Sequence, residues 1–156
     1  MNCGGAPYTD SRGSLWEPDR FFNRGAAYGE SLNPRGPRPY GGDIAETTDD
    51  PLYQTERWFP PDEQVEASYR IPLPVGNYRI TLYFAELCRS TTRLFDVSIE
   101  GQILLKDFDL ATVPFATAHQ EHREARVDDG FLDLKFVHRG GQDCKVSAIE
   151  ITPQTR

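Results

Sequence analysis

The clearest pattern in the chain is the alternation of apolar and polar side chains over residues 78–86, which read YRITLYFAE. Even-numbered positions from 78 to 84 are apolar, and the residues between them are polar or amphipathic. This period of two is typical of a strand with one buried face. We predict a central strand here, and its far end, 86–89, should reach a rim of the domain where loops carry function.

Several further stretches carry the same alternation of apolar and polar residues. They are residues 67–73, 94–100, 102–107, 131–138 and 146–152. The turn Glu100-Gly101 joins two of them into a predicted hairpin. Residues 116–126 fit either a helical turn or an irregular edge strand, and 52–58 fit a short strand or a turn. Short strands joined by Gly, Pro and Asp turns predict an all-β fold, an antiparallel β-sandwich or jelly roll.

The first fifty residues form a loop-rich segment, because Gly-Gly and Pro-containing turns interrupt every periodic pattern there. This segment also carries an unusual number of aromatic residues: Tyr8, Trp16, Phe21, Phe22, Tyr28 and Tyr40. Such an aromatic content argues against disorder. We therefore expect long N-terminal loops that pack on the sandwich or serve a function.

Length and charge narrow the choice of partners. A chain of 156 residues is expected to form a single domain over 1–156. A net charge of −7 argues against binding to nucleic acid or to anionic membranes. No apolar run reaches the roughly 18 residues of a membrane-spanning helix, so no membrane insertion is expected. The first residues lack the pattern of a signal peptide.

The cysteines and histidines do not have the spacing of a known metal site. Cys3, Cys88 and Cys144 leave at least one thiol unpaired, and a Cys3–Cys144 bridge stays open if the termini lie side by side. His119 and His122 have no Glu between them and no third ligand in range. No cofactor and no catalytic residue are predicted from these groups.

The acidic residues could suggest a glycosidase pair of carboxylates. We instead expect structural hydrogen bonds and ion pairs, for example between Glu86 and either Arg57 or Arg93. A structural Ca²⁺ stays open as an alternative, although no compact calcium loop is present.

Six segments, taken together in order and spacing, resemble the malectin domain over nearly the whole chain. They are NCGG (2–5), LYQTER (52–57), the stretch 76–86 ending in LYFAE, LFDV (94–97), KDFD (106–109) and SAIEI (147–151). The resemblance implies a lectin-like jelly roll that binds an oligosaccharide or polysaccharide without catalysis. Related modules occur in plant receptor kinases and, as carbohydrate-binding modules, on glycoside hydrolases. A covalently linked catalytic domain and an extracellular, periplasmic or secretory-pathway location follow from the same resemblance.

Four residues are the predicted carbohydrate site. By position, the resemblance assigns sugar-stacking aromatic planes to Tyr28 and Trp58 and a hydroxyl-binding carboxylate to Asp143. Arg89 adds a forked donor at the same rim. Members of the family carry two aromatics where this chain has Cys88-Arg89. This departure favours an alternative, a protein-interaction or structural β-sandwich whose sugar site is degenerate.

Overall fold

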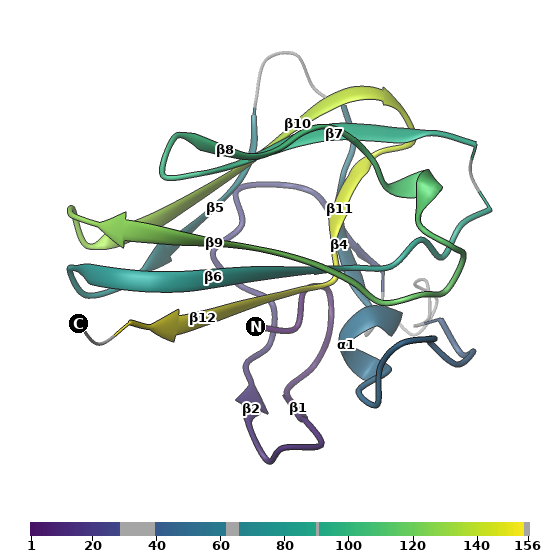
Figure 1. Cartoon of the computed structure of the whole chain (residues 1–156), viewed down its shortest axis with the longest axis horizontal. Coiled ribbons are helices and arrows are strands. Elements are labelled where there is room, and N and C mark those ends of the chain that lie inside the picture. Colours follow the sequence, from purple (N-terminus) through teal and green to yellow (C-terminus); the bar gives the residue numbers. More distant parts are fainter. Residues whose placement is uncertain (29–39, 62–65, 90, 155–156) are drawn as a thin grey trace.

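Two antiparallel sheets face each other across an apolar core in the computed structural model (Figure 1). The structure describes residues 1–28, 40–61, 66–89 and 91–154. One sheet has the order β5 (Ala67–Pro72), β10 (Phe131–Gly141), β7 (Arg93–Ile99) and β8 (Gln102–Asp109). The other has the order β12 (Ala148–Pro153), β6 (Gly76–Phe84) and β9 (His119–Val127). This arrangement confirms the predicted β-sandwich.

Strand β6 has the central place and the buried face that its sequence predicts. It pairs with β12 on one side and with β9 on the other. Its even-numbered side chains from Tyr78 to Phe84 are buried in the core. Phe84 meets Phe95 and Phe108 of the opposite sheet, with ring centroids 6.0 Å apart in both pairs. The chain leaves β6 at the rim, where Cys88 and Arg89 are exposed.

The structure resolves one ambiguous stretch and refines one predicted strand. The segment 116–126 contains the regular strand β9, which pairs with β6 over nine residues and lies at the edge of its sheet, so the helical alternative is wrong. The predicted strand 146–152 divides into β11 (Cys144–Val146) and β12, with Ser147 between them. The β7–β8 hairpin is confirmed, and the 3₁₀ turn η1 (Leu110–Thr112) follows it.

A third sheet lies at one end of the sandwich and forms the base of the candidate site. Its order is β11, β4 (Glu56–Phe59) and β3 (Ala26–Tyr28). The short helix α1 (Pro51–Gln54) precedes β4, so the segment 52–58 is a helical turn followed by a strand. Because β4 pairs with β11, the chain around Trp58 and the chain just after Asp143 are held side by side at the rim.

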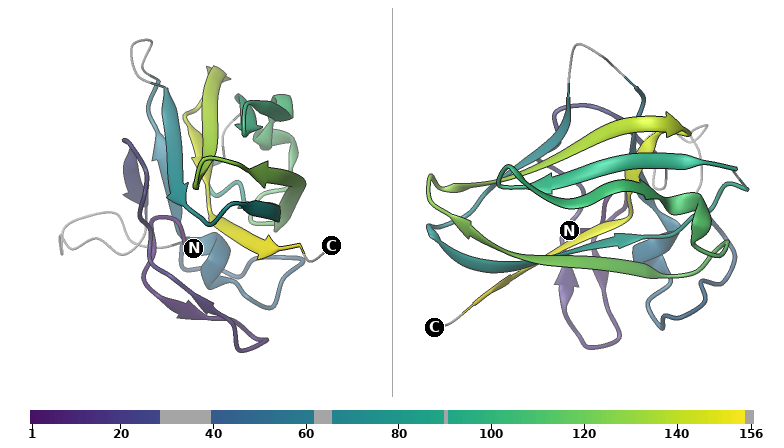
Figure 2. Two further views of the ribbon diagram at one scale, coloured as in Figure 1. Left: turned by 90° about the vertical axis from the view of Figure 1, so that its left-hand side faces the viewer. Right: turned by 45° about the horizontal axis from the view of Figure 1, so that its top comes forward.

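The described parts of the N-terminal segment pack on the sandwich, as its aromatic content predicts (Figure 2): Trp16 joins an apolar cluster on the outer face of the β12–β6–β9 sheet, and Phe22 packs edge-on against Tyr69 of β5. Residues 29–39 lie outside the described residues. The N-terminal segment contains a hairpin, β1 (Tyr8–Thr9) with β2 (Leu15–Trp16), that the sequence pattern did not predict. The amide of Cys3 donates to the carbonyl of Ser147, which fixes the chain start beside β12. A second apolar cluster forms on the outer face of β6 from Trp16, Ile44, Leu52, Tyr53, Tyr83, Ala85, Ala116 and Ala148.

The three thiols are free, so the Cys3–Cys144 bridge that the sequence left open is not formed. Cys3 and Cys144 are buried, and burial raises the pKa of Cys144 to about 12. Cys88 is exposed. Among the described residues, no helix has the length and hydropathy needed to span a membrane.

Candidate functional site

A small pocket of about 140 Å³ opens at the rim beside the end of β6. Strand β4 provides one wall, and the loops that follow β6 and β10 provide the others. The lining residues are Glu56, Trp58, Cys88, Arg93, Gln142 and Asp143. Two of the four predicted site residues, Trp58 and Asp143, therefore lie in the same pocket.

The base of this pocket is a network of buried charges. Lys145 is completely buried, and its Nζ lies 2.7 Å from Glu56 Oε2 and 3.8 Å from Glu86 Oε1. Arg93 Nε lies 2.7 Å from Glu86 Oε2, so Arg93 is one of the two partners predicted for Glu86. In the β11–β4 ladder Lys145 stands opposite Trp58, and opposite residues project to the same face of a sheet, so the buried cation lies beneath the pocket beside Glu56.

Within this network, Glu86 and Arg93 favour each other's charged form. Burial alone would raise the pKa of Glu86, but hydrogen bonds from Arg93 and the charge of Lys145 outweigh burial and hold that pKa below its usual value. Burial would lower the pKa of Arg93, and the Glu86 carboxylate outweighs it and raises that pKa. A satisfied network of this kind fixes side-chain and loop geometry, because each member loses its partner if it moves.

Two loops of the pocket are attached to this network. The amide of Cys88 donates to Glu86 Oε1 at 2.9 Å, and Arg93 Nη1 donates to the carbonyl of Asp143. The Asp143 carboxylate makes no hydrogen bond or ion pair with the described residues. Its backbone is thus held in place while its carboxylate stays available to a ligand.

Trp58 is half-buried in the pocket wall, and its indole nitrogen has an unusual environment. The Nε1 atom is shielded from solvent and has no hydrogen-bond partner among the described residues. A buried donor without a partner costs free energy, and because this atom is shielded, the accessible part of Trp58 is its ring rather than its N–H.

The other two predicted site residues are placed differently. The backbone of Tyr28, in β3, pairs with Glu56 of β4. The side chain of Tyr28 falls outside the described part of the structure. Arg89 is exposed and does not line the pocket; its guanidinium carbon lies 4.6 Å from the ring centroid of Phe115. Arg89 therefore stands on the rim outside the pocket.

Asp96 and Asp109 have structural partners, as expected. Asp96 accepts hydrogen bonds from the amide of Asp107 and from Arg139. Asp109 accepts from the amides of Arg93 and Ala111. The described residues contain no cluster of three or more His, Cys, Asp or Glu side chains suited to a metal ion.

His119 and His122 cannot act as a pair, because three residues along a strand place two side chains on opposite faces. His119 stacks on Phe108 with centroids 5.3 Å apart, whereas His122 is exposed on the outer face.

The fold and the rim pocket can now be compared with known proteins. The chain belongs to the malectin domain family, whose model matches residues 1–153. A malectin domain is a non-catalytic, carbohydrate-binding type of module.

Two plant receptor-like proteins each contain a region similar to this chain. Receptor-like protein 4 of Arabidopsis thaliana is 32% identical over 111 residues, which cover 65% of this chain and 17% of that protein. A probable leucine-rich-repeat receptor-like serine/threonine-protein kinase of the same plant is 27% identical over 192 residues, covering 98% of this chain and 18% of the kinase. The chain thus spans less than a fifth of these relatives.

Solved structures share the fold at lower identity. A β-glucuronidase from Bacteroides uniformis matches 99% of this chain and 18% of its own, with a TM-score of 0.78 and 22% identity. The ANX2 ectodomain from Arabidopsis thaliana matches 99% of this chain and 49% of its own, with a TM-score of 0.78 and 16% identity. At such identity the likeness establishes the fold alone.

Proposed function

We propose that this domain binds a saccharide, without catalysis, in the rim pocket formed by Trp58 and Asp143. The observation that carries the proposal is that an aromatic plane and an unpaired carboxylate share one pocket on a rigid charged base. Sugars present apolar C–H faces and directed hydroxyl groups, and these two side chains are complementary to both.

The size of the pocket limits how much of the ligand it holds. A volume of about 140 Å³ is below the roughly 300 Å³ of a typical small-molecule site, so the pocket takes part of one sugar ring. Each Å² of apolar area that stacking removes from water contributes about 25 cal/mol to binding, and one indole covers only a small area. Affinities between roughly millimolar and micromolar are expected, which correspond to about −4 to −8 kcal/mol.

Tyr28 and Arg89 extend the proposed site beyond the pocket. The backbone of Tyr28 lies in the strand next to β4. Its role as a second stacking plane is proposed from its position in the family resemblance. Arg89, exposed on the rim, is placed to donate hydrogen bonds to a neighbouring sugar unit of a longer chain. The ligand that suits this arrangement is an oligosaccharide or the end of a polysaccharide.

The relatives support a place for the domain in a larger protein outside the cytoplasm. They include a receptor-like protein, a receptor-like kinase and a β-glucuronidase, and the domain covers a minor part of each. We infer that this single module serves as the glycan-binding part of a surface or secreted protein, with a linked catalytic domain among its candidate partners.

Calorimetric titration against a panel of neutral glucose and galactose oligosaccharides tests the proposal. Trp58→Ala should weaken binding of the recognised sugar by about tenfold or more, since the aromatic plane is lost. The matched control is Phe131→Ala, an exposed aromatic on the first sheet away from the pocket, which should bind as the natural chain does. Absence of binding at millimolar sugar would contradict the proposal.

A second candidate function is protein interaction through the same rim. It is favoured by Cys88-Arg89, which stand where the family carries two aromatics, and by the exposure of both residues. A protein partner whose binding survives Trp58→Ala, in a chain that binds no sugar, would support this function instead.

A further inference from the structure

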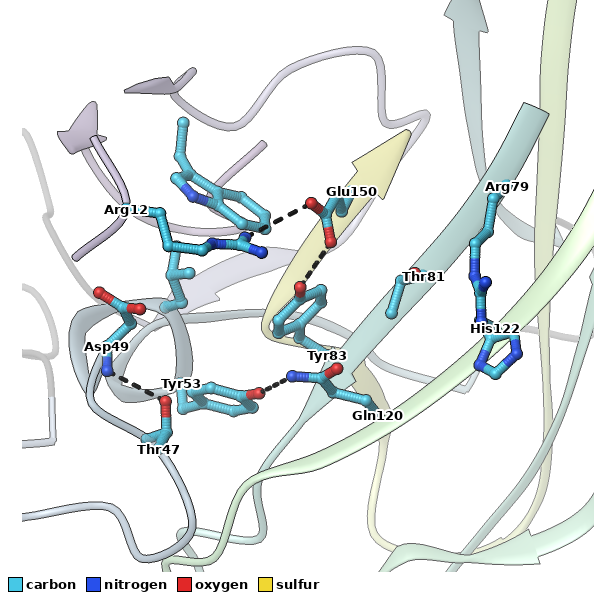
Figure 3. A pocket seen from close by; sticks show the side chains of 12 residues that line it. Arg12, Thr47, Asp49, Tyr53, Arg79, Thr81, Tyr83, Gln120, His122 and Glu150 are labelled. Atoms are coloured by element: carbon cyan, nitrogen blue, oxygen red, sulfur yellow. Dashed lines mark hydrogen bonds and ion pairs between the residues drawn. The ribbon is translucent and has the colours of Figure 1, made fainter. Parts of the chain in front are cut away.

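A second and larger cavity, of about 310 Å³, lies on the outer face of the β12–β6–β9 sheet, away from the rim pocket. The β1–β2 hairpin and the segment leading into α1 provide its walls. Figure 3 shows Arg12 and Asp49 on one side of this cavity, and Arg79 with His122 on the opposite side. Its volume is at the lower end of the range for small-molecule sites.

The floor of the outer cavity is rigid and polar. The rings of Tyr53 and Tyr83 are buried with centroids 5.6 Å apart, and Trp16 packs edge-on against Tyr83 at 5.3 Å. Their polar atoms are tied to neighbours: the Tyr83 hydroxyl donates to Glu150 Oε2 at 2.6 Å, and Gln120 Nε2 donates to the Tyr53 hydroxyl at 2.7 Å (Figure 3). Because the rings are buried against one another, a ligand in this cavity would meet mainly hydroxyl, amide and charged groups.

The acidic groups of the cavity already have partners. Asp49 accepts from the Tyr8 hydroxyl at 2.9 Å and from the Ser11 amide at 2.7 Å. Glu150 accepts from Tyr83, and Arg12 Nη2 lies 3.6 Å from its other oxygen. Arg12 also pairs with Asp10. The carboxylates are thus hydrogen-bonded or ion-paired within the wall, although the partners of Asp49 are neutral donors and only Asp10 and Glu150 face a cation.

Arg79 is the exception among the charged groups of the cavity. It is exposed and makes no hydrogen bond or ion pair with the described residues. Glu124 stands opposite Arg79 in the β6–β9 ladder, yet the two side chains form no ion pair. Thr81 lies two residues further along the same face, opposite His122. A free guanidinium beside a hydroxyl is suited to a carboxylate that belongs to a hydroxylated ligand.

We propose that this outer cavity is a second binding site, for a small hydroxyl-rich carboxylate of the sugar-acid class. Its carboxylate binds Arg79, and its hydroxyls bind Thr81, Gln120 and the tyrosine hydroxyls of the floor. The site is independent of the rim pocket, because the two cavities share no lining residue.

The two tryptophans of the chain allow each cavity to be observed separately. Trp16 lines the outer cavity and its Nε1 donates to Asp10 at 3.0 Å, while Trp58 lines the rim pocket. In a ¹⁵N-labelled sample each indole gives one N–H signal. Titration with glucuronate at about 0.15 M salt, where charges beyond about 8 Å are screened, should shift the Trp16 signal.

Variants and probes separate the parts of the proposal. Arg79→Gln should weaken the glucuronate effect on Trp16 by about tenfold, the size expected for an exposed charge-assisted contact. Arg126→Gln, on the same outer face but outside the cavity, is the matched control and should leave the effect unchanged. Glucose lacks the charge and acetate lacks the hydroxyls, so both should act at least about tenfold more weakly than glucuronate.

Three outcomes would overturn the proposal. The first is a Trp16 signal that does not move at tens of millimolar glucuronate. The second is an equal response in Arg79→Gln, which would show that the guanidinium does not hold the carboxylate. The third is an equal response to acetate or to glucose, which would reduce the site to simple anion or sugar adsorption. A response that persists in Trp58→Ala would support the site even if the rim pocket binds nothing.

Discussion

Lys145 Nζ lies 2.7 Å from Glu56 Oε2, and the Lys145 side chain has no exposed surface. Glu56 lines the rim pocket while Lys145 is buried beneath it, so the pair couples the shape of the pocket to the stability of the domain. A buried charge that loses its partner must be desolvated without compensation, and this cost exceeds the net contribution of the intact pair.

Lys145→Met should therefore lower the free energy of unfolding by about 3–5 kcal/mol, because Glu56 is left without its cation. Urea denaturation measures the change. Lys135→Met is the matched control, since Lys135 pairs with Glu66 at 2.8 Å but both side chains are about half exposed or more. That control should cost less than about 1 kcal/mol. Equal effects of the two variants would show that the buried network is not required for stability.

Asp10 should make the N-terminal hairpin sensitive to acid. Hydrogen bonds from the Trp16 indole and from the amides of Ser14 and Arg12 outweigh burial and lower the pKa of Asp10 from 3.8 to about 2. A carboxyl whose pKa is lower in the folded state stabilises the fold above its unfolded pKa, and this contribution is lost as pH falls. The window runs from pH 3.8 down through about 2.

The measurement for Asp10 is stability against pH for the natural chain and for Asp10→Asn. The natural chain should lose stability across that window, while the variant should be less stable at neutral pH and show a flatter acid slope. Identical slopes for the two proteins would contradict the assignment. The Trp16 indole signal reports directly on the hydrogen bond in question.

The native protein should expose a single reactive thiol. Cys88 is exposed, whereas burial raises the pKa of both Cys3 and Cys144 well above that of a free thiol. Because the thiolate is the reactive form, a chromogenic disulfide reagent should modify one equivalent quickly, and the other two after unfolding in urea. Cys88→Ser should remove the fast phase, and a fast phase that persists in it would refute the burial of the other two.

Gly4 is required by two features of the fold. Its φ of +69° is unfavourable for other residues, and a Cβ there would overlap the carbonyl of Glu56. Gly13 has a φ of +82° and no neighbour within 4 Å of its Cβ position, so it isolates the cost of conformation alone. Gly13→Ala should cost about 1 kcal/mol and Gly4→Ala at least about 2–3 kcal/mol in unfolding free energy. Equal losses would show that the contact with Glu56 does not matter.

The sequence predicts the sandwich because its main strands are half-buried and alternate. Strand β6 shows this best, with every apolar position from Tyr78 to Phe84 in the core. The pattern was ambiguous for β9, since an exposed edge strand rich in His, Glu and Arg has little apolar signal. It missed the β1–β2 hairpin because two-residue strands are too short for any period to appear.

The candidate site was predicted less completely, for a different reason. Trp58 and Asp143 follow from family resemblance, and the structure brings them into one pocket. Lys145 has no sequence signal that separates it from an exposed polar residue, and only the folded structure shows that it is buried between Glu56 and Glu86. The outer cavity combines the first hairpin with β6 and β9, and no local pattern brings such distant segments together.

The most direct test of saccharide binding at the rim is the indole spectrum of the ¹⁵N-labelled domain during titration with the neutral oligosaccharide that binds best in calorimetry. The account predicts that the Trp58 N–H signal shifts and saturates while the Trp16 signal stays in place. A saturable response of Trp16 with no movement of Trp58, or no response of either signal at millimolar sugar, would contradict it.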